Sequence, residues 1–214
     1  MNPFRYPEVR HSRSQNPGPF SEYRRYKPFL KAEFVRQCVY CRMPDGIKGD
    51  DAFGVDHYRP SSKFPELRTA YWNLFYSCNT CNRRKGNFWP GEQQRLAGVF
   101  IPNPCDHSMS EHLGYHGVDI EPKSRAGQFV LDVLLLNDSE SRSYRRWVVR
   151  SIERCLSEAA RIMATLVELD RLTATAAGPA LEELLHDRRV LEESFAGIQE
   201  DLERLSCHRL TMPA

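Results

Sequence analysis

The residues with the clearest capacity for chemistry lie between positions 55 and 86 of this 214-residue chain. The pair Asp56 and His57 opens this stretch, and a basic run closes it. An imidazole is a base that works near physiological pH, so His57 can take a proton from a water molecule. The carboxylate of Asp56 is a hard oxygen ligand of the kind that Mg²⁺ or Mn²⁺ prefers. A base and a divalent cation together can hydrolyse a phosphodiester bond.

The two residues must have different roles, because they are neighbours on a strand predicted over residues 53–58. Successive residues of a strand point to opposite faces. We therefore expect Asp56 to bind the catalytic ion and His57 to act as the base. The simpler alternative for His57 is a histidine that only completes a hydrogen bond at the end of the strand.

Two Cys-x-x-Cys pairs, one on each side of Asp56, predict a structural metal site. Cys38 and Cys41 form the first pair, and Cys78 and Cys81 form the second. Two such pairs separated by a long insert have the spacing of a tetrahedral zinc site with four thiolate ligands. Such a site is closed, so Zn²⁺ would stabilise the fold and would not catalyse. The alternative is two unrelated pairs of free thiols in a reducing compartment.

Basic and acidic residues are unevenly distributed along the chain. Residues 1–100 contain 17 Lys or Arg and 9 Asp or Glu, whereas residues 101–214 contain 13 and 19. A positive N-terminal half suits a polyanion such as DNA, although many basic surfaces bind no nucleic acid. The sequence has neither an apolar run of about 18 residues nor a secretory leader. We therefore expect a cytoplasmic protein that does not contact a membrane.

Further motif positions make this stretch resemble a known enzyme family. Asp56 and His57 are followed by Asn73 in a Trp-Asn-Leu context and then by the pattern Cys-x-x-Cys-Asn-x-x-Lys-Gly. This order over residues 38–90 resembles the HNH endonuclease family in its four-cysteine form, which implies a small ββα-metal fold. The resemblance implies that Asn73, the central Asn, fixes a loop and orients the base. It also implies that Asn82, at the third motif position, is the second protein ligand of the catalytic ion.

Several residues near the motif have two interpretations. Asn82 could simply cap the short helix that we expect after it and that should end at Gly86. Five basic side chains could contact the phosphates of a nucleic acid or could form a solvated basic face; they are Arg59, Lys63, Arg83, Arg84 and Lys85.

The wider sequence carries a second, narrower resemblance. The segments DHYRPSSKFPEL, YWNL and WP, together with NPC and a later LLLN segment, resemble a group of stand-alone bacterial HNH proteins. Some members of that group are associated with phage-defence or mobile-element loci. This resemblance implies the nuclease effector of a bacterial phage-defence system.

The chain as a whole is predicted to be an α+β protein. Residues 1–36 should form an extended basic arm and a short helix that is kinked or starts late at Pro28. The nuclease module is expected over residues 37–100, with turn-forming residues 44–51 joining two short strands. A loop-rich connector over residues 101–125 follows, with room for one hairpin.

Residues 126–214 are predicted to be mainly helical. Segment 126–136 is strongly apolar, and apolar residues recur at helical spacing over residues 140–174 and 180–205. We expect the last two segments to form an antiparallel pair. Their amphipathic leucine pattern motivates the hypothesis that this region binds a protein partner, an ATPase or a sensor, or mediates self-association.

The sequence favours a metal-dependent endonuclease that nicks or cleaves DNA, with Zn²⁺ as the structural ion and Mg²⁺ or Mn²⁺ as the catalytic ion. One alternative is a zinc-stabilised nucleic-acid-binding module without catalysis, which would not need Asp56 and His57 as a pair. A second alternative is an RNA-cleaving nuclease, which would use the same active site.

Overall fold

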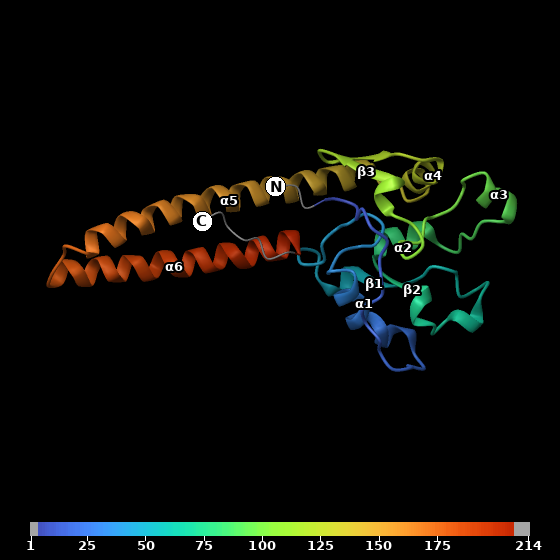
Figure 1. The fold of residues 1–214 in the computed structure, drawn as a ribbon, viewed down its shortest axis with the longest axis horizontal. Helices are drawn as coiled ribbons and strands as arrows, with labels where there is room; N and C mark the ends of the chain where they lie inside the picture. The colour runs from blue at the N-terminus through green and yellow to red at the C-terminus, as the bar shows by residue number, and fades with distance from the viewer. Residues whose placement is uncertain (1–3, 208–214) are drawn as a thin grey trace. The chain divides into compact units, whose positions relative to one another are not determined.

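The computed structural model describes residues 4–207 (Figure 1). Residues 1–3 and 208–214, the ends of the predicted arm and of the predicted helical region, lie outside the described residues. The chain forms two compact units, one that runs to Arg146 and one that begins at Trp147. None of the helices within residues 4–207 is long and apolar enough to cross a membrane.

A two-stranded sheet followed by a short helix forms the centre of the first unit. Strands β1 (Phe53–His57) and β2 (Leu74–Cys78) pair in antiparallel register, with Phe53 opposite Cys78 and His57 opposite Leu74. Helix α2 (Asn79–Lys85) follows β2 directly. This arrangement confirms the predicted α+β class and the ββα module. Its register places the second cysteine pair at one end of the sheet and His57 at the other.

Helix α2 begins earlier than the sequence predicted. The expected start lay after Asn82, whereas the helix starts at Asn79 because Cys78 acts as its N-cap. The Cys78 sulfur accepts a hydrogen bond from the backbone N–H of Cys81 at 3.4 Å. The helix ends at Gly86, whose φ of 53° lies in the left-handed region that glycine adopts without strain.

The region around the first cysteine pair differs from the prediction of two short strands joined by residues 44–51. Only an isolated bridge between Gln37 and Pro44 forms there, with a short 3-10 helix at Asp50–Ala52. The backbone between the two cysteines folds back on itself, because Arg42 donates its N–H to the carbonyl of Cys38 and has a positive φ. A turn this tight brings two sulfurs together but interrupts strand pairing.

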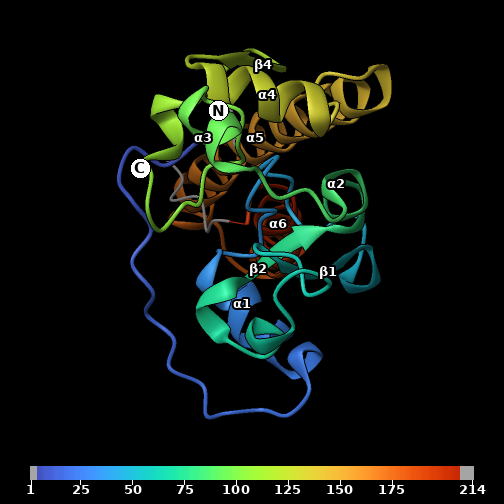
Figure 2. The ribbon, with the colours of Figure 1, turned by 90° about the vertical axis from the view of Figure 1, so that its right-hand side faces the viewer.

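The N-terminal residues run along one side of the first unit in extended conformation (Figure 2). They lead into a 3-10 turn (Tyr23–Tyr26) and helix α1 (Lys27–Glu33), which has Pro28 in its first turn. Pro28 therefore starts the helix, as the late-start alternative predicted. Phe4 and Tyr6 are buried rather than free in solvent, so this segment is packed against the rest of the unit.

The connector contains the hairpin that the sequence allowed. After α3 (Glu92–Leu96), strands β3 (Leu113–His116) and β4 (Asp119–Pro122) pair in antiparallel register. Helix α4 (Arg125–Val133) follows, and the Ser124 hydroxyl caps it by accepting from the N–H of Gly127 at 3.0 Å.

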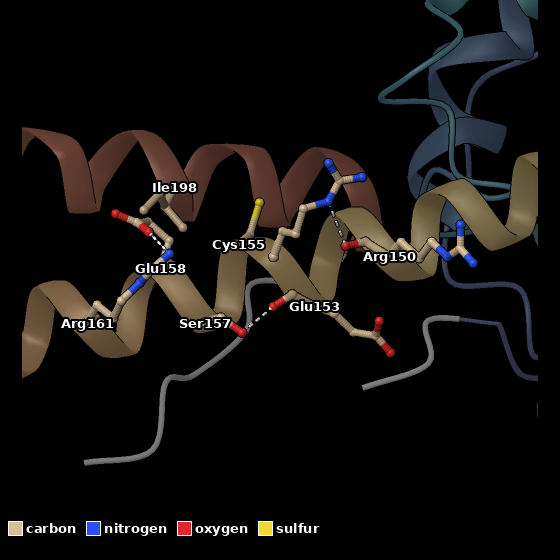
Figure 3. A pocket seen from close by; sticks show the side chains of 8 residues that line it. Arg150, Glu153, Cys155, Ser157, Glu158, Arg161 and Ile198 are labelled. Carbon is tan, nitrogen blue, oxygen red and sulfur yellow. Dashed lines mark hydrogen bonds and ion pairs between the residues drawn. The ribbon is translucent and has the colours of Figure 1, made fainter.

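Two long antiparallel helices dominate the second unit (Figure 1). Helix α5 (Ser139–Thr173) enters this unit at Trp147, and helix α6 (Pro179–Ser206) returns beside it. These bounds lie within one residue of the predicted segments. A cavity of about 800 Å³ lies along the pair. Figure 3 shows the arginine side chains of α5 on this face and Cys155 pointing towards α6.

Candidate active site

The four motif cysteines form one buried cluster. The sulfur atoms of Cys38, Cys41, Cys78 and Cys81 lie within 4.8 Å of one another. The Cys41 and Cys78 sulfurs are 3.8 Å apart. Four thiolates about 2.3 Å from a tetrahedral zinc ion would be separated by roughly this distance. The cluster therefore has the donor atoms and the spacing of a closed four-thiolate metal site.

Two of these thiols also need a cation to ionise. Contact with the Cys38 sulfur raises the pKa of Cys41 and of Cys81, and burial adds to this effect. Crowding several thiolates without a counter-charge is unfavourable, so these groups become ligands only together with a metal ion.

His57 is held at the end of β1 with one ring nitrogen engaged. Its Nε2 lies 2.9 Å from the backbone oxygen of Arg68. A carbonyl oxygen only accepts, so Nε2 is the donor in this bond, and in the neutral ring Nδ1 then has the lone pair. The ring of Tyr23 meets the His57 ring edge-on at 4.6 Å between centroids. The hydrogen bond and the ring contact therefore fix the orientation of the His57 ring.

Asn73 fixes the loop that carries this carbonyl. The buried side chain accepts from the N–H of Arg59 at 2.8 Å and donates to the Arg59 oxygen at 3.1 Å. It also donates to the oxygen of Leu67 at 3.4 Å. Because Arg68 lies in the same loop, Asn73 holds the group that orients His57. The role in orienting a catalytic base that the family resemblance implied for Asn73 stays a prediction.

Asp56 lies in a buried hydrogen-bond network. Tyr40 donates to its Oδ2 at 2.5 Å, and the Lys85 ammonium is 3.0 Å from its Oδ1. Lys85 also donates to the backbone oxygen of His57 at 2.6 Å. Each carboxylate oxygen has two lone pairs, so Asp56 keeps acceptor capacity beyond these two donors. The ammonium beside it would repel a divalent ion, so ion binding at Asp56 competes with Lys85.

Asn82 offers a second oxygen. Its Nδ2 lies 3.5 Å from the backbone oxygen of Val55, one residue before Asp56, which leaves its side-chain oxygen as an acceptor. Asp56 and Asn82 together supply the hard oxygen donors that a Mg²⁺-like ion takes. The donor types suit such an ion, but the Asp56 side chain is only 3% exposed and already accepts from Tyr40 and Lys85, so an ion at Asp56 has to displace Lys85.

The five predicted phosphate contacts lie in different environments. Lys63 and Arg83 are exposed, and Arg59 is half-buried. Arg84 donates to the backbone oxygens of Leu134 and Leu135 and pairs with Asp138. The side chain of Lys85 is 1% exposed.

The burial of Lys85 contradicts its prediction as a phosphate contact. A phosphate on the surface cannot reach a buried ammonium, so Lys85 belongs to the internal network with Asp56. Arg84 similarly ties α2 to the segment after α4, because its guanidinium is directed at that backbone.

Sequence reasoning missed the polar groups that anchor the N-terminal segment. The Arg13 guanidinium lies 4.8 Å from the centre of the Phe75 ring and donates to the oxygen of Leu74 at 2.7 Å. Buried Glu33 accepts from the Tyr71 hydroxyl at 2.8 Å and from the N–H of Ser14 at 2.7 Å. The arm therefore does not present Arg13 to DNA. No local pattern identifies these partners, because they are 19 to 61 residues apart in the chain.

Residues 38–88 match the family model described as HNH endonuclease, so this part of the chain is an HNH endonuclease domain. The resemblance stated from the motif is thereby confirmed. Two curated relatives are both named Septu protein PtuB. The protein from Bacillus thuringiensis is 28% identical over 129 residues, which cover 58% of this chain and 47% of the relative. The protein from Bacillus mycoides (strain KBAB4) is 27% identical over 164 residues, which cover 63% and 55%.

The chain spans about half the length of these curated relatives. No solved structure matches it. The comparisons therefore identify the domain and its relatives.

Proposed function

We propose that this protein is a metal-dependent endonuclease that hydrolyses phosphodiester bonds of DNA. The observation that carries the proposal is the state of His57, whose Nε2 is bound to a carbonyl oxygen while Nδ1 is available as a base. The oxygen donors Asp56 and Asn82 on the neighbouring elements support it.

The residues of the domain suggest how water would be activated. Nδ1 of His57 takes a proton from a water molecule that attacks the phosphorus. The oxygen of Arg68 then stabilises the charged imidazolium through the Nε2 hydrogen bond. Asn73 keeps that oxygen in place, so it is a positioning residue.

A second group of residues would stabilise the negative charge on the phosphate. A Mg²⁺ or Mn²⁺ ion held by Asp56 and Asn82 would supply stabilisation of the developing negative charge and of the departing oxygen. The exposed side chains of Lys63 and Arg83, with Arg59 at the loop, would hold the phosphates of the nucleic acid. The four-cysteine cluster would hold Zn²⁺ and stabilise the sheet end opposite His57.

The cellular role is the second part of the proposal. Both curated relatives are Septu proteins, and the wider motif resembles bacterial HNH proteins of phage-defence loci. We infer a cytoplasmic nuclease effector of such a system. The helical pair of α5 and α6 would bind a regulatory partner, an ATPase or a sensor, or a second copy of the chain.

Two other functions use the same residues. A nucleic-acid-binding module without catalysis would need the cysteines but would not need the Nε2-bound tautomer of His57. An RNA nuclease would share the whole site.

The test is cleavage of supercoiled plasmid and of a folded RNA by purified protein with Mg²⁺ or Mn²⁺. Replacement of His57 by Ala should reduce the cleavage rate by about 10²- to 10⁴-fold, the usual contribution of a general base. His186→Ala, at an exposed position of α6, is the matched control and should cleave normally. Zinc content is measured in all three proteins.

The outcomes separate the candidate functions. If the protein cleaves the RNA and not the plasmid, its substrate is RNA and the proposed cleavage of DNA is wrong. Zinc-loaded wild type that binds DNA without cutting it, in the presence of either ion, would favour the binding module.

A further inference from the structure

A cavity of about 650 Å³ lies beside the candidate active site. Its wall includes Tyr58 and Arg59, the two residues that follow His57 in the chain. Consecutive Cα atoms are about 3.8 Å apart, so the Cα atoms of Arg59 and His57 are at most about 7.6 Å apart. The rest of the wall comes from Phe64 and from residues 89–107. One part of the cavity wall is therefore within two residues of His57 along the chain.

Aromatic rings from different segments form much of the wall. The Trp89 ring meets Tyr58 and Phe64 nearly edge-on, at centroid distances of 5.5 and 5.3 Å. Across residues 100–107, the ring of Phe100 lies 5.4 Å from that of His107. Edge-to-face packing fixes the angle of the Trp89 ring relative to the Tyr58 and Phe64 rings. The cavity wall therefore includes aromatic rings in a fixed orientation.

These rings do not serve as an ordinary hydrophobic core. Helix α3 borders the cavity, yet all of its residues are exposed, and Leu96 is 78% exposed. In Figure 1, α3 lies at the outer edge of the unit. In a hydrophobic core Leu96 would pack over these rings and be buried with them. Instead, Phe64, Trp89 and Phe100 are only half-buried.

Charged groups stand beside the rings. The Arg59 guanidinium lies over the Trp89 ring, 5.3 Å from its centre, and Arg95 also lines the cavity. The carboxylate of Asp106 is fixed because its Oδ2 accepts from Asn103 at 2.9 Å, and its Oδ1 remains as an acceptor. Flat rings, cations and a fixed acceptor together match a nucleotide, with its planar base, its phosphate and its N–H groups.

We propose that this cavity binds one unstacked nucleobase of the strand whose phosphate lies at His57. The inference rests on the proposed cleavage of nucleic acid and narrows its substrate class. A base inside a duplex is stacked on both neighbours and cannot enter the cavity. The substrate is therefore a single strand or a locally unpaired one.

The test measures binding by the His57→Ala variant of the 214-residue chain, so that no strand is cut. The probes are a single-stranded oligonucleotide, its duplex, and copies of the single strand that each lack one base at a different position. DNA and RNA versions of every probe are compared. Trp89→Ala and Phe100→Ala are each added to the His57→Ala protein. Trp147→Ala, in the helical pair, is the matched tryptophan control.

We expect the single strand to bind about 10-fold more tightly than the duplex. Loss of the base at one position should weaken binding by about 10-fold. In the Trp89→Ala and Phe100→Ala proteins the same loss should have no further effect, whereas the Trp147→Ala protein should behave as its parent. The version that shows the position-specific effect, DNA or RNA, identifies the strand.

A flat response to base removal at every position would overturn the proposal. So would duplex binding equal to single-strand binding. Zinc content verifies the fold of the Trp89→Ala protein, and Phe100→Ala repeats the test if that protein fails to fold.

The nuclease and the base site can fail separately. If the wild type cuts plasmid but removal of a base has no effect at any position, the proposed nuclease is supported and the proposed base site is wrong. If removal of a base weakens binding at one position but no substrate is cleaved, the proposed base site is supported and the proposed nuclease activity is wrong.

Discussion

Charged side chains before Arg146 join segments far apart in the chain and are often buried, whereas those after Trp147 pair at the surface. Asp56 and Lys85, 29 residues apart, have side chains that are 3% and 1% exposed. In the helical pair, Arg188 lies 3.3 Å from Asp170, and their side chains are 40% and 54% exposed.

The difference shows how each unit is specified. A buried charge without its partner is expensive, so the network around Asp56 permits one arrangement of sheet, helix and loop. Exposed pairs contribute little, so the helical pair depends on its apolar spacing and on its turn at Gly178. The buried network therefore fixes side-chain positions more strictly than the exposed pairs do.

The largest expected effect comes from removing one thiol of the four-cysteine cluster. Cys78→Ser should abolish folding of the first unit, because zinc contributes about 10 kcal/mol or more to such sites, comparable with the whole stability of a domain. Zinc content, near-ultraviolet circular dichroism and limited proteolysis of the full chain measure the loss. The helical signal of α5 and α6 should persist.

Cys155→Ser is the control for this experiment, because Cys155 lies on α5 outside the cluster. It should keep full zinc content. Simultaneous loss of all helical signal in Cys78→Ser would show that the two units fold as one.

Removing the buried cation should have the next largest effect. Lys85→Met leaves the Asp56 carboxylate without its ammonium, which should cost about 3–5 kcal/mol of unfolding free energy. Chemical denaturation measures the change, and zinc content shows that the cluster is retained. An effect below about 1 kcal/mol would mean that the pair behaves like a surface pair and would remove the contrast between the units.

A smaller effect should depend on pH. Burial by itself would raise the pKa of Glu33, but hydrogen bonds outweigh it and lower that pKa below its ordinary value of 4.5. The donors are Ser14, Tyr71, Gln15 and His11. A carboxyl with a lowered folded-state pKa stabilises the protein above its unfolded-state value, and this contribution is lost as pH falls through the folded-state value.

Glu33→Gln should therefore be less stable than wild type at pH 7 and should lose less stability between about pH 5 and pH 3. Unfolding midpoints across this range test the prediction. Parallel pH curves for the two proteins would contradict it.

The smallest effect is expected in the helical pair. Arg188→Ala should change the unfolding free energy by about 1 kcal/mol or less, because both partners are exposed. Thermal unfolding at low and high salt is the measurement. A salt-sensitive loss of unfolding free energy as large as that of Lys85→Met would show that the Arg188–Asp170 pair contributes strongly to stability.

Much of the fold follows from local patterns. The strand predicted over residues 53–58 appears as β1, and the two long helices end within one residue of their predicted bounds. Cysteine spacing also indicated the cluster. Prediction was wrong around residues 44–51, because a turn inside the first cysteine pair replaces strand pairing.

The sequence by itself determined the ββα module, the four-cysteine cluster and the positions of His57 and Asn73 in the motif, because each depends on spacing within a short stretch. Only the tertiary structure decided that Lys85 is buried against Asp56, which also accepts from Tyr40, and that Arg13 is packed against Phe75. It also placed Trp89 and Phe100 around one cavity. These outcomes depend on which distant segments meet. A charged side chain that becomes buried at such a contact must pair with another group in the interior.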